Sequence, residues 1–158
     1  EERITWVEHS NLHVTLAFLG DTEEAMINIA SVLLKRIFTD VCEFSFNLQG
    51  TGVFRSYNDP RVLWCGIAHS KELINLYRQI TIGLADTGFK MEERYFKPHI
   101  TLGRIKSIRD ISRLRKAVDQ FQSTLIQEVF VREVILYESI LKPSGPVYKP
   151  IGRFKLHA

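Results

Sequence analysis

The sequence predicts an α+β protein with two pseudo-symmetric lobes, each a mainly antiparallel sheet with outer helices, flanking a central cleft. Two observations predict this fold class. Strand-like segments with alternating apolar residues are interleaved with segments whose apolar residues recur every three or four positions, as in helices. The order of these segments repeats, and each half of the chain contains one His-x-Thr-Leu motif. We expect the two motif strands to face each other across the cleft.

The first half carries its motif near its start, after a short apolar run. Its expected elements are an apolar run at 4–7, a motif strand at 11–19, a helix at 21–38, a strand at 43–49 and a loop at 50–60. The motif strand, Asn-Leu-His-Val-Thr-Leu-Ala-Phe-Leu, ends at Gly20. Asp21 is placed to cap the helix, with Glu24 three residues later completing a capping box. The loop is predicted from its glycines and from the Asn-Asp-Pro turn signal at 58–60.

The second half repeats this order after an additional strand and helix. Its expected elements are a central strand at 61–68, a helix from Ser70 to near Gly88, a motif strand at 97–104, a helix opened by Asp110, a strand at 126–141 that bends near Arg132, and a last strand after a turn at 144–146. The first half is about 26 residues shorter, which is enough for one strand and one helix. We therefore expect residues 1–158 to form one two-lobed domain that lacks an opening strand and helix.

The bulk composition is that of an ordinary globular protein. Hydrophobic residues make up 45% of the 158 positions and the net charge is only +3, so neither disorder nor a nucleic-acid partner follows from composition. Cys42 and Cys65 lie in apolar, strand-like surroundings, which indicates reduced core residues of a cytoplasmic protein. No apolar run approaches the length of a membrane span. We expect a cytoplasmic monomer.

Each His-x-Thr motif places an imidazole beside a hydroxyl. Side chains two positions apart in a strand point to the same face, so His13 pairs with Thr15 and His99 pairs with Thr101. An imidazole gives or takes a proton near neutral pH, and the repeated pairs favour an acid–base site. A lone strand histidine is more often a hydrogen-bonded structural residue. A zinc site is not expected, because a hydroxyl rather than a second metal ligand accompanies each imidazole.

Longer segments around the motifs resemble a known family. Those segments are Trp6-Val7, the two motif segments, Arg61-Val62-Leu63-Trp64 and Leu136-Tyr137-Glu138-Ser139. They are similar to the RNA 2′,3′-cyclic phosphodiesterases, also called the 2′-5′ RNA ligase family, of the two-histidine phosphoesterase superfamily. The resemblance implies hydrolysis of RNA 2′,3′-cyclic phosphate ends to 2′-phosphates, without a metal ion or cofactor. It also implies a strand and a helix before the Trp-Val segment.

The resemblance further implies a role for each motif residue. His13 would be the acid that protonates the departing 3′ oxygen, and His99 would be the base that activates water. Thr15 and Thr101 would donate hydrogen bonds to the non-bridging phosphate oxygens. Because the two halves look alike, the sequence does not decide which histidine is the acid and which is the base.

Two more residues are expected to bind substrate by the same resemblance, Arg104 the phosphate and Phe18 the base. Each lies five positions after its motif histidine, so strict alternation would turn it to the opposite face. Both reach the site only if the strands bulge or end near Ala17 and Gly103. Gly103 favours a bulge on the second strand, whereas nothing marks one on the first. An aromatic residue such as Phe18 or Trp64 is more often part of the core than a base-stacking platform.

Several functions share these residues. Ligation of RNA halves through a 2′-5′ linkage is the reverse reaction, and small cyclic phosphodiesters could replace RNA ends as substrate. A non-catalytic RNA-binding module is a further alternative. Basic residues crowd after the second motif and form either a solvated helix face or a rim that attracts phosphate. They are Arg104, Lys106, Arg109, Arg113, Arg115 and Lys116.

Overall fold

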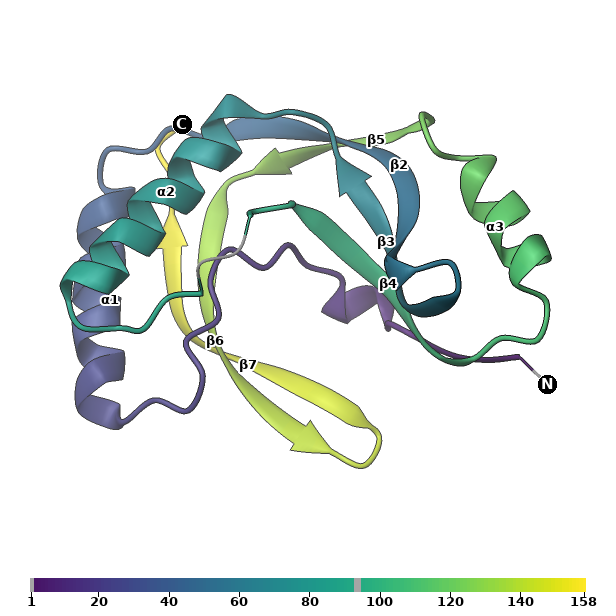
Figure 1. Cartoon of the computed structure of the whole chain (residues 1–158). Helices are drawn as coiled ribbons and strands as arrows, with labels where there is room; N and C mark the ends of the chain where they lie inside the picture. The colour runs from purple at the N-terminus through teal and green to yellow at the C-terminus, as the bar shows by residue number, and fades with distance from the viewer. Residues whose placement is uncertain (1, 93–94) are drawn as a thin grey trace. The chain divides into compact units, whose positions relative to one another are not determined.

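The computed structural model describes residues 2–92 and 95–158 (Figure 1). Its elements in order are β1 (Arg3–Trp6), η1 (His9–Asn11), α1 (Glu24–Phe38), β2 (Phe44–Ser56), β3 (Asp59–Ile67), α2 (Lys71–Asp86), β4 (His99–Ser107), α3 (Ile111–Asp119), β5 (Leu125–Val131), β6 (Glu133–Lys142) and β7 (Gly145–Lys155). The chain divides into two compact units. Unit 1 comprises Glu1–Thr15, Phe46–Ser70 and Tyr95–Val129, and unit 2 comprises Leu16–Ser45, Lys71–Arg94 and Phe130–Ala158.

Unit 1 is built on a five-stranded sheet in the order β1-β4-β3-β2-β5. The predicted central strand is confirmed, since β3 is the middle strand and pairs antiparallel with both β2 and β4. Helix α3 covers one face, where Val118 packs with Leu63 of β3 and Ile105 of β4. These side chains are each at most 9% exposed. The sheet therefore has one face filled by α3 and an opposite face left for other side chains.

The predicted loop at 50–60 is wrong, because β2 continues through it to Ser56. The glycines serve close packing rather than a turn. A Cβ on Gly50 would lie 2.5 Å from the carbonyl oxygen of Gln122, and one on Gly52 would lie 2.2 Å from Cζ2 of Trp64. The register shifts between Leu48 and Thr51, so the strand bulges at Gly50 and then resumes its pairing.

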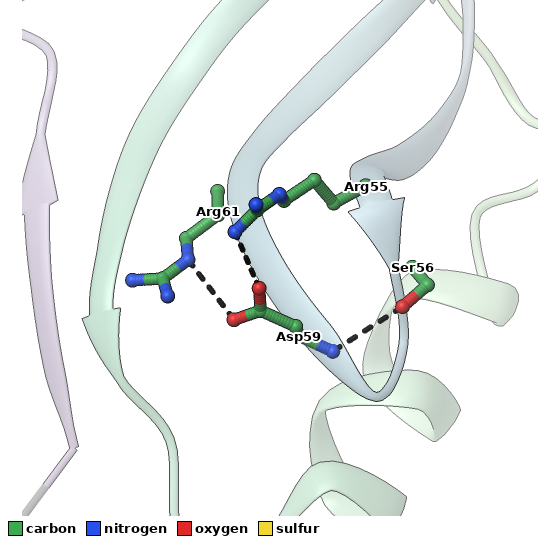
Figure 2. A network of polar contacts seen from close by, with 4 residues as sticks. All are labelled: Arg55, Ser56, Asp59 and Arg61. Carbon is green, nitrogen blue, oxygen red and sulfur yellow. Dashed lines mark hydrogen bonds and ion pairs between the residues drawn. The ribbon is translucent and has the colours of Figure 1, made fainter.

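The turn between β2 and β3 is held by a small polar network (Figure 2). The Asp59 carboxylate accepts from Arg55 at 2.5 Å and forms an ion pair with Nε of Arg61 at 2.9 Å, and the Asp59 amide donates to the Ser56 hydroxyl at 3.3 Å. Arg55 has a left-handed backbone conformation (φ 75°), which costs about 1–2 kcal/mol in a residue with a Cβ. The exposed ion pairs offset part of this, at about 0.2–1 kcal/mol each.

Helix α3 begins where the sequence predicts, at Asp110. The Asp110 carboxylate accepts from the amide of Arg113 at 2.9 Å, which is an N-cap hydrogen bond. At the other end the Tyr57 hydroxyl donates to Asp119 at 2.9 Å, joining the β2–β3 turn to the helix. Burial, and then the bond to Asp119, raise the pKa of Tyr57. These contacts fix the helix against the sheet.

Unit 2 has its own core between α1, α2 and the β6–β7 pair. The fully packed residues of this core are Ala30, Leu34, Phe38, Leu76, Ile80, Leu84 and Leu156. The predicted Asp21 cap is wrong, since α1 begins at Glu24 and its N-cap residue, Glu23, makes no side-chain cap bond. The reason is a turn just before it, where the Thr22 hydroxyl donates to the carbonyls of Leu19 and Gly20 at 3.3 and 3.0 Å.

The predicted long strand at 126–141 is two strands separated at Arg132. β5 is the edge strand of the five-stranded sheet, whereas β6 pairs antiparallel with β7 from Glu133 to Lys142. The expected bend therefore marks a change of sheet. The cysteines are both free, but only Cys65 is a core residue, because Cys42 is exposed.

Among the described residues, no helix combines the length and the apolar character that crossing a membrane requires.

Candidate active site

The second motif lies on β4, between β1 and β3. His99 is opposite Gly66, and Thr101 is opposite Trp64 of β3. Residues directly opposite in an antiparallel pair point to the same face. Since Leu63 of β3 faces α3, Trp64 and Thr101 face the other way. We call this face, opposite α3, the site face.

A bulge at 102–103 brings Arg104 to the site face as well. Thr101 pairs with Trp64, but Gly103 pairs with Leu63, so β4 contains one residue more than β3 at this point. Arg104 is then opposite Val62, and both lie on the same face as Thr101. The bulge predicted near Gly103 is confirmed. Gly103 also leaves no room for a side chain, since a Cβ there would lie 2.9 Å from Cγ2 of Ile4.

The first motif lies beside β4 without forming a strand. The strand predicted over 11–19 is wrong, because His9–Asn11 form a short 3-10 helix and Val14 pairs only through an isolated antiparallel bridge to Ile100. A strand needs a ladder of neighbouring backbone bonds. Val14 is the one residue of 12–19 for which the described part of the chain shows such a neighbour.

The single bridge nevertheless brings the two motifs together. An antiparallel bridge between Val14 and Ile100 sets His13 opposite Thr101 and Thr15 opposite His99. In a regular pair such residues have Cβ atoms about 4.5–5.5 Å apart. His13 and Thr15 are exposed while Val14 is half-buried, as expected if both motif side chains share the site face. We expected the motifs in opposite lobes, but both belong to unit 1.

Each histidine is oriented by a carbonyl group two residues earlier. Nδ1 of His13 lies 2.6 Å from the carbonyl oxygen of Asn11, and Nδ1 of His99 lies 2.7 Å from that of Lys97. A carbonyl oxygen only accepts hydrogen bonds, so Nδ1 carries the proton and donates. In the neutral ring the lone pair is then on Nε2. The two motifs thus present the same nitrogen for proton transfer.

Phe54 contacts His99, and Trp64 and the Lys97 ammonium pack next to Phe54. The Phe54 ring meets the imidazole edge-on with centroids 4.6 Å apart, and Trp64 lies 5.4 Å from Phe54. The Lys97 ammonium is 4.3 Å from the Trp64 centroid. Sequence reasoning missed Phe54, which it assigned to a loop, and it missed Lys97. Gly52 is opposite Trp64 in the sheet, a pairing between residues distant in the sequence, so no local signal marked the continuing strand that carries Phe54.

Phe18 falls in unit 2, on a segment with no regular secondary structure. Its side chain is 70% exposed, so it is not a core residue. Leu16, Ala17 and Leu19 pack instead against the unit 2 core. The position of Phe18 is therefore that of a solvent-facing aromatic residue, and its expected role in base binding stays a prediction.

Comparison with known sequences identifies relatives along most of the chain. A sequence model of the 2′-5′ RNA ligase superfamily matches residues 2–139. The RNA 2′,3′-cyclic phosphodiesterase of Thermotoga maritima is 39% identical over 146 residues, which are 92% of this chain and 75% of that protein. The RNA 2′,3′-cyclic phosphodiesterase of Archaeoglobus fulgidus is 35% identical over 150 residues, 94% of this chain and 82% of that protein.

Solved structures share the fold. TT0787 of Thermus thermophilus superposes with a TM-score of 0.83 at 28% identity, over 97% of this chain and 82% of that one. LigT of E. coli complexed with 3′-AMP superposes with a TM-score of 0.76 at 28% identity, over 96% and 80% of the two chains. The α+β fold class predicted from the sequence is confirmed. The paired His-x-Thr motifs, the shared fold and the match along the sequence lead to one conclusion: this chain belongs to the 2′-5′ RNA ligase superfamily.

Proposed function

We propose that this protein hydrolyses the 2′,3′-cyclic phosphate at the end of RNA and leaves a 2′-phosphate, without a metal ion. The observation that carries the proposal is the bridge between Val14 and Ile100, which sets an imidazole and a hydroxyl of each motif side by side. The substrate class is supported by the relatives from Thermotoga maritima and Archaeoglobus fulgidus, both named RNA 2′,3′-cyclic phosphodiesterases.

In this proposal His99 is the base and His13 is the acid. Nε2 of neutral His99 takes a proton from water, and the resulting hydroxide oxygen bonds to phosphorus. The bond from phosphorus to the 3′ oxygen breaks, and protonated His13 gives its Nε2 proton to that oxygen. One imidazole must start neutral and the other protonated, so the rate should depend on pH as a bell-shaped curve. The Nδ1 bonds to backbone carbonyls support this use of Nε2.

The remaining site residues would stabilise charge and hold the substrate. The hydroxyls of Thr15 and Thr101 would donate to the non-bridging oxygens as negative charge builds on them. Arg104, turned to the site face by the bulge, would add a permanent positive charge in a fork that suits phosphate. Phe18 would stack on the terminal base, as the family resemblance implies. We also propose that the protein acts in the cytoplasm as a monomer.

The test is hydrolysis of a short oligonucleotide with a 2′,3′-cyclic end, in the presence of EDTA. We expect His13→Ala and His99→Ala each to lower kcat/KM by about 10²–10⁴. His69→Ala is the matched control, because His69 is exposed and lies outside both motifs. Full turnover in either motif variant would end the two-histidine mechanism. Loss of wild-type activity in EDTA would end the proposal of metal independence.

Ligation is the second candidate, favoured by the superfamily to which the chain belongs. A ribose hydroxyl of a second RNA would replace water as the nucleophile, and the same residues would act. Incubating two RNA halves and measuring joined and hydrolysed products separates the two directions. We expect hydrolysis to dominate because water is the more abundant nucleophile. A non-catalytic RNA-binding module would instead bind RNA after both histidines are replaced and would turn over neither substrate.

A further inference from the structure

The site face continues along β4 beyond Arg104. Ile105 is 4% exposed in the core beneath α3, whereas the next residue, Lys106, is exposed. Strand alternation therefore places Lys106 on the same face as Arg104. From His99 to Lys106 the strand extends about 20 Å, at about 3.3 Å per residue. A row of functional and basic side chains thus follows β4 away from the two motifs.

Strand β1 adds a second basic residue to this end of the face. Thr5 is opposite Arg104, and Ile4 packs on the α3 side, opposite Ile105. Arg3 precedes Ile4 in the strand, so its side chain lies on the site face. The register shifts between Arg3 and Ile4, so Lys106 is the additional residue of β4 beside Arg3.

Strand β3 adds Arg61 on the other side of β4. Phe54 pairs with Val62 and Arg55 pairs with Pro60, so Arg61 is the additional residue of a bulge between Pro60 and Val62. Val62 is opposite Arg104 on the site face. The Nε of Arg61 is bound by Asp59 at 2.9 Å (Figure 2), which leaves two terminal amino groups as additional donors of the guanidinium.

We propose that Arg3, Arg61 and Lys106, here called the basic track, bind the phosphodiester backbone of the RNA that precedes the cyclic end. The inference rests on the proposed function and specifies its substrate: an oligonucleotide, preferred over a cyclic mononucleotide. The track begins next to Arg104 and leads away from the His–Thr pairs, so in this proposal the RNA that precedes the last phosphate follows β4. Lysine and arginine contacts to phosphate add affinity that does not depend on base sequence.

The opposite face of the sheet supplies a matched control. Arg113 and Lys116 are exposed on α3, and α3 packs on the face that the basic track does not share. R61Q/K106Q and R113Q/K116Q each remove two positive charges from unit 1. A general effect of net charge would appear in both double variants, whereas loss of RNA binding along the basic track would appear only in R61Q/K106Q.

The first measurement compares kcat/KM for a 2′,3′-cyclic mononucleotide and for an eight-nucleotide RNA with the same end. We expect the wild type to prefer the longer substrate, and R61Q/K106Q to lose most of this preference while it hydrolyses the mononucleotide at the wild-type rate. R113Q/K116Q should keep the preference. Equal kcat/KM for the two substrates in the wild type, with hydrolysis intact, would overturn the basic track and leave the proposed function standing.

The second measurement does not depend on catalysis. Binding of a fluorescent eight-nucleotide RNA is followed by anisotropy at 50 and 200 mM salt. Loss of two phosphate contacts should reduce the salt effect on affinity by about sevenfold, from a slope of about 0.7 per contact for single strands. We expect this reduction in R61Q/K106Q and not in R113Q/K116Q, and equal behaviour of the two double variants would overturn the track. If the wild type hydrolyses neither substrate, the proposed function fails and this comparison alone decides the track.

Discussion

The two His-x-Thr motifs present the same chemistry from different supports. The second motif is part of β4, which pairs with β1 on one side and with β3 on the other. The first motif has no strand of its own and is attached to β4 at Val14. Yet Nδ1 of each histidine donates to the carbonyl two residues earlier, at 2.6 and 2.7 Å. Ring orientation is therefore a local property of the motif, and the sheet decides only where the motif lies.

The difference in backbone support predicts that the two motifs differ in local stability and not in their effect on turnover. Replacements within the motifs should affect turnover equally in both, because in the proposed mechanism the side chains act on the same phosphate. Replacements that alter the backbone support should affect mainly the second motif, because β4 is where that support lies.

After the histidines, the largest expected effect on turnover comes from the threonines. Thr15→Val and Thr101→Val keep the side-chain shape but remove the hydroxyl, so each should lower kcat/KM by about a hundredfold, as removal of one oxyanion donor does. Steady-state hydrolysis of a cyclic-ended oligonucleotide measures this. Thr124→Val is the control, since Thr124 is exposed and lies outside both motifs. A loss confined to one motif would break the equivalence.

Hydrogen exchange should distinguish the two supports. Amides of 100–105 lie within a sheet, whereas those of 13–18 lie on a segment with one bridge. We expect the β4 amides to exchange at least about a hundredfold more slowly, because ladder bonds open only with the sheet. Exchange measured by NMR or mass spectrometry on the full chain gives the result. Equal protection of the two segments would show that the first motif is supported by more than its bridge.

The next effect is a loss of stability on substitution at the bulge of β4. Gly103→Ala puts a methyl group 2.9 Å from Cγ2 of Ile4 and should lower the free energy of unfolding by about 1–3 kcal/mol. Ala17 occupies the equivalent position after His13, four residues on. Ala17→Gly changes the same methyl group in reverse and should cost about 1 kcal/mol or less. Urea unfolding compares the two, and an equal or larger loss at Ala17 would contradict the asymmetry.

The smallest expected effect is on stability at high pH and concerns Tyr57, which donates a hydrogen bond to Asp119 of α3. Because the pKa of Tyr57 is raised in the folded protein, its neutral form is favoured there. The stability that this adds is complete below the unfolded pKa of 10.0 and is lost as the pH rises through the folded pKa. We expect the stability difference between the wild type and Tyr57→Phe to shrink above about pH 10. Urea unfolding at pH 8 and pH 10.5 measures it; Tyr95→Phe, at an exposed tyrosine, is the control.

The elements that were predicted correctly are determined by residues close together in the sequence. The Asp110 cap, the apolar run of β3 and the Gly103 bulge each depend on a few neighbouring residues. Gly88 also lies where the sequence placed it, just after α2, with a positive φ of 100°. The four motif residues were chosen from their repetition alone, and both motifs lie in unit 1.

The elements that were missed depend on partners distant in the sequence. Residues 12–19 have the alternation of a strand, but alternation does not supply a neighbouring strand. Gly50 and Gly52 look like loop residues until Gln122 and Trp64 are known to occupy the space of their absent side chains. Phe54 was missed for the same reason, because its contact with His99 follows from the continuation of β2.

The carbonyl that orients each imidazole lies only two residues before it. A stretch of five consecutive residues, from that carbonyl to the threonine, therefore holds the orienting bond, the imidazole and the hydroxyl that the proposed mechanism uses in each motif. A copy of such a stretch would carry the orientation of its imidazole with it, because the carbonyl that fixes the ring is part of the stretch. It could also be grafted onto the exposed strand of an unrelated designed protein, where the host would need to provide only a second copy on the adjacent backbone.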